Sequence, residues 1–174
     1  MVKHWTEKEL NEELKKLTII VDSREQSTAP QKYFESKGIP YQIRKLESGD
    51  YSAMLGSLTL EHDVFIERKS GLTELSGNMG VNRERFVREF TRAKADSAKP
   101  FLLIENDSID DIFLGNYRSK LPPKSLWGSL CTWMTRYNTT VLFCRPENTG
   151  RIIFGILYYY AREDLIKNGD QRQR

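Results

Sequence analysis

The residues best suited to chemistry lie in one segment, residues 48 to 74, which reads SGDYSAMLGSLTLEHDVFIERKSGLTE. Asp50 follows a glycine, and an apolar run further on ends in Glu67, Arg68 and Lys69. Two carboxylates that lie together can hold a hard divalent cation such as Mg²⁺, which prefers oxygen ligands. A neighbouring ammonium group can orient a water or offset charge that develops on a phosphate. The segment therefore contains the groups that metal-assisted phosphodiester hydrolysis requires.

Strand geometry predicts how these side chains meet. Side chains alternate between the two faces of a strand, so a strand through this apolar run directs Glu67 and Lys69 to one face. Arg68 then points to the opposite face, where a structural ion pair is its favoured role. A two-residue turn that begins at Gly56 predicts a hairpin, and that hairpin brings Asp50 beside Glu67.

The elements predicted around this segment alternate between strands and helices. The predicted strands are Thr18–Val21, Tyr41–Leu46, Val64–Lys69, Phe101–Glu105 and Thr140–Cys144. The predicted helices are one that ends near Leu17, then Pro30–Lys37, Leu72–Met79, Arg83–Ala95, Ile109–Phe113, Leu126–Tyr137 and Ile152–Leu165. Residues 115–124 are expected to form a loop. After an early hairpin this order predicts an α/β domain with a mixed central β-sheet flanked by α-helices.

Length and composition favour one globular domain. The 174 residues suffice for a single hydrophobic core, and we divide them into an N-terminal helix (1–17), the main domain (18–167) and a polar tail (168–174). Apolar residues make up 39% and charged residues 29%, as in ordinary globular proteins. The net charge of +3 is small, so a nucleic-acid partner would have to bind a local basic patch.

The sequence shows no sign of membrane insertion or secretion. No stretch approaches the roughly 18 consecutive apolar residues of a membrane span, and the opening MVKHWTEKEL lacks the apolar region of a signal peptide. Cys131 and Cys144 belong to no metal-binding motif, and no GxxxxGK[ST] motif indicates a nucleotide cofactor. We therefore expect a protein of the cytoplasm, associated with the nucleoid or acting in a phage-infected cell.

Three short motifs occur in a specific order. VDSRE, at residues 21–25, is followed by GDY and then by ERK, which begins 17 residues after the aspartate of GDY. This order resembles the nuclease domain of the XPF family, within the PD-(D/E)XK nucleases, over residues 18 to 160. The resemblance implies a restriction-endonuclease-like fold and DNA cleavage that depends on Mg²⁺ or Mn²⁺.

The resemblance supports the same central residues as the spacing does. In the family the aspartate of GDY and the glutamate of ERK bind metal, which implies these roles for Asp50 and Glu67. The lysine of ERK is catalytic in the family, which implies this role for Lys69. A third acid, Asp22, is expected either to complete the metal shell or to hold an arginine.

Three further residues are assigned more than one role. Glu25 either contributes to the site through a bound water or is a loop residue without a functional role. Arg24 and Arg68 look like the family's motif arginines, and we expect them to contact phosphate or to orient carboxylates. The candidate catalytic set is therefore Asp22, Arg24, Glu25, Asp50, Glu67 and Lys69, with Arg68 as a DNA contact.

One position departs from the family pattern. In family members the ERK motif is usually followed by three residues and then an aspartate. In this chain that position is Thr73, and Glu74 follows it. If the helix is shifted by one residue, Glu74 serves in place of that aspartate. Otherwise a supporting carboxylate is absent and activity is weaker or differently tuned.

The predicted helix over residues 83–95 has two distinct faces. Its apolar face is formed by Phe86, Val87, Phe90 and Ala93. Arg85, Arg88 and Arg92 recur at i, i+3 and i+7 on another face. These arginines fit either a solvated charged face or a row of phosphate contacts.

The leading hypothesis is a metal-dependent DNA endonuclease that acts on branched or flapped DNA in repair, recombination or replication. The preference for branched DNA rests on the resemblance alone. Family members usually carry helix-hairpin-helix domains that bind DNA. We expect this chain to be a nuclease domain without them, so the domain itself, a homodimer or a partner would recognise junctions. The alternatives are a non-catalytic nuclease fold that binds DNA or pairs with an active subunit, and a sequence-specific restriction-like nuclease.

Overall fold

The computed structural model describes residues 4–80 and 83–168, apart from the side chain of Arg85, and so includes only Asn168 of the predicted tail. The strands are β1 (Leu17–Asp22), β2 (Tyr41–Arg44), β3 (Tyr51–Leu55), β4 (Leu58–Thr59), β5 (Val64–Lys69), β6 (Lys99–Glu105) and β7 (Thr140–Cys144). The helices are α1 (Glu7–Leu14), α2 (Ala29–Lys37), α3 (Leu72–Met79), α4 (Arg83–Ala95), α5 (Ile109–Leu114), α6 (Pro123–Tyr137) and α7 (Thr149–Asn168), with a 3₁₀ turn, η1 (Pro146–Asn148), before α7.

In the described part of the chain, seven strands form one mixed sheet in the order β2-β1-β3-β5-β6-β7, with β4 paired to β3. Neighbouring strands β1 and β2 are parallel, as are β5, β6 and β7. Strand β3 runs antiparallel to both β1 and β5. The predicted α/β fold with a mixed central sheet flanked by helices is therefore confirmed.

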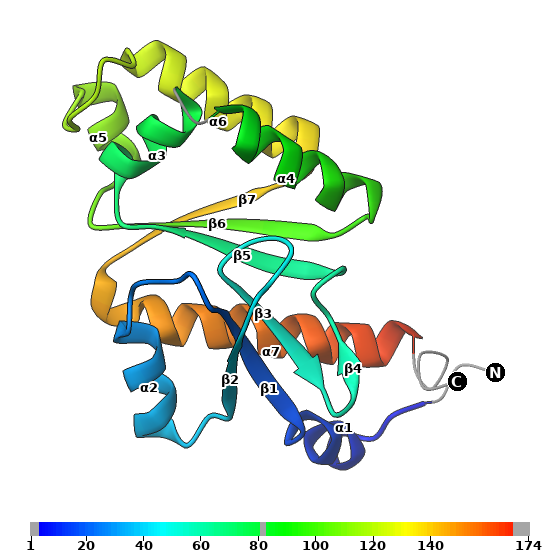
Figure 1. Cartoon of the computed structure of the whole chain (residues 1–174). Coiled ribbons are helices and arrows are strands. Elements are labelled where there is room, and N and C mark those ends of the chain that lie inside the picture. The colour runs from blue at the N-terminus through cyan, green and yellow to red at the C-terminus, as the bar shows by residue number, and fades with distance from the viewer. Residues whose placement is uncertain (1–3, 81–82, 169–174) are drawn as a thin grey trace.

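Helices cover both faces of the sheet (Figure 1). Val64 and Ile66 of β5 face a core that also includes residues of α1, α2 and α7. Phe65, between them, faces a second core with residues of α3, α4 and α6. This alternation confirms the predicted period of two in β5, and it assigns opposite faces of the sheet to Glu67 and Arg68.

The N-terminal helix is shorter than predicted. Thr6 and Glu9 form a capping box at its start, but α1 ends at Leu14 and not near Leu17. The reason is that Leu17 already belongs to β1, where it pairs with Leu55. Leu10 and Leu14 are buried in the core of the sheet, so α1 packs on the main domain.

The predicted loop over residues 115–124 is also shorter, because α6 begins within it at Pro123. Proline suits the first turn of a helix, where its missing N–H would have no intrahelical partner. Further along α6, Trp133 stacks on Phe86 with ring centroids 4.2 Å apart, so it packs in the core on this face of the sheet. No helix in the described ranges has both the length and the apolar character needed to cross a membrane.

Candidate active site

The C-terminal ends of β1 and β5 lie beside the N-terminal start of β3 in the middle of the sheet, and Asp50 is the residue before β3. The Asp22 N–H donates to the Asp50 carbonyl (2.8 Å), and the Asp50 N–H donates to the Ile66 carbonyl (2.9 Å). The Arg68 N–H then donates to Oδ2 of the Asp50 carboxylate (2.7 Å). These bonds hold the start of β3 between the ends of β1 and β5, which is the arrangement that the hairpin prediction requires.

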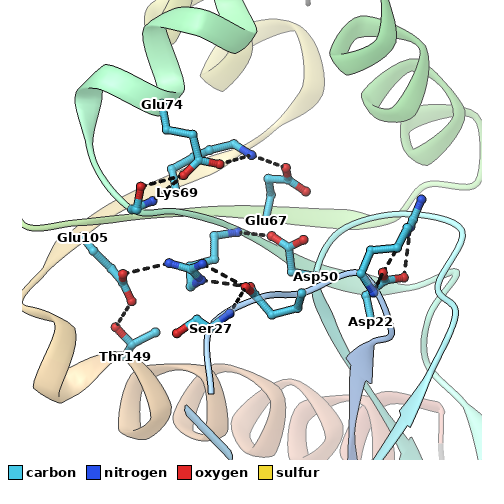
Figure 2. Close-up of polar contacts among 12 residues, drawn as sticks. Asp22, Ser27, Asp50, Glu67, Lys69, Glu74, Glu105 and Thr149 are labelled. Atoms are coloured by element: carbon cyan, nitrogen blue, oxygen red, sulfur yellow. Dashed lines mark hydrogen bonds and ion pairs between the residues drawn. The ribbon is translucent and has the colours of Figure 1, made fainter. Parts of the chain in front are cut away.

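A cavity of about 260 Å³ opens at these strand ends. It is lined by Asp22, Arg24, Gly49, Asp50, Glu67, Lys69, Asn78, Phe86 and Glu89. Figure 2 shows the side chains of Glu67, Lys69 and Glu74 on the α3 side of β5, whereas Glu105 and Thr149 lie on the side of α7. The structure therefore brings Asp50, Glu67 and Lys69 to one cavity, as predicted.

Lys69 is held between two carboxylates. Its Nζ lies 2.6 Å from Oε1 of Glu67 and 3.5 Å from Oε1 of Glu74. Burial opposes the charged form of Lys69, but the carboxylate of Glu67 raises the lysine pKa above its usual value. Lys69 is therefore a fixed positive charge at neutral pH.

The pKa values of Asp50 and Glu67 are both raised. Desolvation, followed by the nearby charge of Glu67, holds the pKa of Asp50 well above its usual range. Burial likewise raises the pKa of Glu67, despite the opposing effect of Lys69. Two desolvated carboxylates that face one cavity are oxygen donors of the kind that Mg²⁺ and Mn²⁺ prefer, so this donor pair fits a hard divalent cation.

Asp22 is occupied by other partners. Its Oδ1 accepts from the backbone N–H and Nε of Arg24 (2.8 and 2.7 Å), and its Oδ2 accepts from Nη2 of Arg24 and from the Leu46 N–H (3.0 and 2.6 Å). Burial opposes ionisation, but these hydrogen bonds lower the pKa of Asp22. Of its two expected roles, the structure shows the holding of an arginine.

The expected shell of three carboxylates is not formed. Among the described residues no group of three or more His, Cys, Asp or Glu side chains is placed to hold a metal ion. The cause is local, because Asp22 is turned towards Arg24. Arg24 is itself half-exposed, and it lines the cavity beside Asp50. Asp22 thus holds the positively charged guanidinium of Arg24 beside the cavity.

Arg68 lies on the other face of the sheet in a buried ion-pair network. Its Nε and Nη2 donate to both oxygens of Glu25 (2.9 Å each), and Nη1 donates to Oε2 of Glu105 (2.8 Å). The other oxygen of Glu105 accepts from the Thr149 hydroxyl at the start of α7. The predicted ion pair of Arg68 is confirmed. Only 12% of the Arg68 side chain is exposed, which leaves little of it free for DNA.

Thr73 and Glu74 point in different directions. The Glu74 carboxylate accepts from the backbone N–H and hydroxyl of Ser70 (2.9 and 2.8 Å) and approaches Lys69. Burial opposes ionisation of Glu74, but the bonds from Ser70 lower its pKa. Thr73 instead accepts the Arg118 N–H through Oγ1 (3.0 Å). Glu74 therefore places a carboxylate beside Lys69, whereas Thr73 contacts the chain at Arg118.

One site residue, Glu89, was not identified from the sequence. This residue of α4 lines the cavity, and its Oε1 accepts the Gly49 N–H at 2.7 Å. The bond fixes the turn that precedes Asp50. A signal was present, because Glu89 follows Phe86 by three residues and so borders the buried face of the helix. A carboxylate at such a position is unusual without a partner.

Gly49→Ala should destabilise the protein and displace Asp50. The backbone of Gly49 has φ +71°, and an added Cβ would lie 2.5 Å from Cδ2 of Phe65 and 2.9 Å from the Ile66 carbonyl. Strain and overpacking together should cost about 2–4 kcal/mol in urea denaturation. Gly38→Ala is the matched control, since Gly38 has φ +63° but no atom within 4 Å of the added Cβ. Equal losses for the two variants would contradict the packing argument.

Helix α4 borders the cavity through Phe86 and Glu89. Arg88 and Arg92 are exposed, and the nearest acid to Arg88 is Glu84, at 3.9 Å. Arg92 follows the cavity residue Glu89 by three residues, which places it on the same side of the helix one turn later. The side chain of Arg85 is outside the described part of the structure. Phosphate contact by these three arginines stays a prediction.

Comparison with known proteins identifies the family. A family model described as the ERCC4 domain matches residues 21–155. The chain belongs to the ERCC4 domain family. The match spans the three motifs VDSRE, GDY and ERK, so the resemblance drawn from them is confirmed.

Solved structures agree with this ERCC4 domain in fold. XPF from Aeropyrum pernix superimposes with a TM-score of 0.62 at 19% identity, over 82% of this chain and 61% of that chain. The same protein in complex with DNA gives a TM-score of 0.62 at 17% identity, over 84% of this chain and 66% of that chain. The ERCC4 domain thus spans less than two thirds of either structure. A search of curated proteins gives no match.

Proposed function

We propose that this ERCC4 domain is a DNA endonuclease that hydrolyses phosphodiester bonds with Mg²⁺ or Mn²⁺. The observation that carries the proposal is the shared cavity of Asp50, Glu67 and Lys69, in which two desolvated carboxylates face a fixed ammonium. The family match and the DNA complex of the similar XPF structure support DNA as the substrate.

The protein groups divide the chemical work. Asp50 and Glu67 would hold the cation, which when bound polarises a phosphoryl oxygen and lowers the pKa of a water. Lys69 orients the attacking water or offsets charge that develops on the phosphate, and Glu67 and Glu74 keep its ammonium in place. Arg24, fixed by its bidentate pair with Asp22, is suited to bind a non-bridging phosphate oxygen.

We extend the proposal to branched or flapped DNA, in repair, recombination or replication, because the family resemblance favours such substrates. Recognition of a junction would come from this domain, from a homodimer or from a partner. A cytoplasmic site of action, at the nucleoid, is part of the same proposal.

Cleavage of a labelled flap in the presence of Mn²⁺ tests the proposal. The unaltered protein should cut, and Asp50→Asn, which removes one charge from the cation site, should not. Absence of cutting by the unaltered protein on flapped, branched and duplex DNA would favour a non-catalytic module. Digestion of a plasmid separates the remaining alternative, because discrete sequence-defined fragments without a preference for branches would indicate a restriction-like nuclease.

Replacement of Arg85, Arg88 and Arg92 by alanine should weaken DNA binding and flatten its salt dependence. Each lost phosphate contact changes the slope of log K against log salt by about 0.9 on duplex DNA. Fluorescence anisotropy in EDTA measures this slope without cleavage. An unchanged slope would return these residues to the solvated charged face that the sequence also allows.

A further inference from the structure

Helix α5 and its connection to α6 form an exposed surface that combines apolar and basic side chains. Phe113 is 56% exposed and Leu114 is 70% exposed. Residues 113–124, which we name the α5–α6 surface, include no acidic residue and three basic residues, Arg118, Lys120 and Lys124. All three are exposed, and no ion pair joins them to another described residue. Contiguous exposed apolar side chains are a common feature of surfaces that bind a partner.

The backbone of this surface is fixed from within. The Tyr117 hydroxyl donates to the Leu121 carbonyl (2.8 Å), and the Leu121 N–H donates to Oγ of Ser119 (3.1 Å). Nδ2 of Asn116 donates to Oδ1 of Asp111, which also forms the capping box of α5. The basic side chains are therefore carried on an ordered backbone, which lowers the entropy lost on binding.

The ring of Phe113 is supported on one side and open on the other. Its centroid lies 5.2 Å from that of Trp127, which follows Lys124 on α6 by one turn. Trp133 and Tyr137, further along the same helix, are buried. Phe113 is thus an aromatic group whose exposed face is free for stacking, beside side chains that carry positive charge.

This surface adjoins the active site through the residue that departs from the family pattern. Thr73 Oγ1 accepts the Arg118 N–H at 3.0 Å, which anchors the surface to α3. The next residue, Glu74, approaches Lys69. The cavity itself is rich in carboxylates, including Asp50 and Glu67, so an approaching phosphate backbone requires positive groups around the cavity.

We propose that the α5–α6 surface binds an unpaired DNA strand, with a base stacked on Phe113 and phosphates contacted by Arg118, Lys120 and Lys124. Aromatic rings stack on every base, and basic side chains follow the backbone, so this combination suits single strands. That the bound strand leads into the cavity of Asp50 and Glu67 rests on the proposed nuclease function. The unpaired arm of a branched DNA would then lie across α3.

Binding is measured by anisotropy with a fluorescent single-stranded oligonucleotide and with a duplex hairpin of the same length, in EDTA so that neither is cut. Phe113→Ala should weaken single-strand binding roughly tenfold, and Phe113→Trp should retain it. The combined Arg118→Ala, Lys120→Ala and Lys124→Ala variant should reduce the salt slope by about 2. Tyr159→Ala and the combined Lys8→Ala, Lys32→Ala and Lys37→Ala variant, all exposed positions on other helices, should bind as the unaltered protein does.

Three results would overturn the proposal. Unchanged single-strand affinity for Phe113→Ala and the triple variant is one, and equal losses for single strand and duplex is another. The third is an altered oligomeric state in light scattering with unchanged DNA binding, which would assign the surface to a protein contact. Because the assay involves no cleavage, a chain that binds single strands through this surface but cuts no DNA would refute the nuclease proposal and leave this one standing.

Discussion

Lys69→Ala is expected to remove DNA cleavage while leaving DNA binding largely intact. The change deletes the ammonium that lies 2.6 Å from Oε1 of Glu67 in the candidate cavity. Loss of one preorganised charge at a reacting phosphate should reduce kcat by at least roughly 10²–10³-fold. The arginines of α4 are unaltered, so affinity measured by anisotropy in EDTA should change little. Single-turnover cleavage of a labelled flap with Mn²⁺ measures the loss.

Two controls separate chemistry from folding in this experiment. In the unaltered protein the Lys69 Nζ lies 5.4 Å from the centroid of the Phe86 ring. Lys69→Met keeps an unbranched apolar side chain of similar length beside this ring and removes the charge. It should be as inactive as the alanine variant. Lys37→Ala changes an exposed lysine of α2 and should cut at the normal rate. Comparable turnover by Lys69→Met and the unaltered protein would refute a catalytic role for Lys69.

Arg68→Ala should be the most destabilising of the variants. It leaves the carboxylates of Glu25 and Glu105, which are 3% and 7% exposed, without their cationic partner. Removal of one member of a buried ion pair costs about 3–5 kcal/mol, because the remaining charge is desolvated and unpaired. Urea denaturation should show this loss. Arg162→Ala, which breaks an ion pair with the exposed Glu7, should cost less than about 1 kcal/mol.

The same network predicts a pH dependence. Burial opposes ionisation of Glu25, but the hydrogen bonds from Arg68 lower its pKa below the usual value of 4.5. A lowered pKa in the folded state means that Glu25 contributes stability above pH 4.5, and this contribution is lost as pH falls through the folded pKa. Arg68→Ala should remove this acid-dependent loss. An unaltered stability profile between neutral and acidic pH in the variant would contradict the assignment.

Local patterns in the sequence predicted most of the fold. The bounds of β5 and α4 follow directly from alternation and helical spacing, and the opposite placement of Glu67 and Arg68 follows from the period of a strand. Errors occurred where a long-range pairing decided the outcome. Leu17 joins β1 because Leu55, distant in the sequence, lies beside it, and no local pattern reports that contact.

In the candidate site, too, local patterns identified some residues and long-range contacts decided the roles of others. Asp50, Glu67 and Lys69 were identified because motif spacing and strand geometry both indicate them. The partners of Asp22 include the N–H of Leu46, and the partner of Glu89 is the N–H of Gly49. Both are backbone groups of turns far away in the sequence, and backbone N–H groups carry no sequence signature. Their roles therefore required the three-dimensional arrangement.

Binding of Mn²⁺ at Asp50 and Glu67 is the claim on which the proposed chemistry depends. A crystal of the protein soaked in Mn²⁺, with anomalous diffraction recorded from the metal, tests it most directly. We predict an anomalous peak in the cavity between the two carboxylates, and no peak there in crystals of the Asp50→Asn variant. A cavity without such a peak at saturating Mn²⁺, or an ion held elsewhere by other residues, would contradict the account.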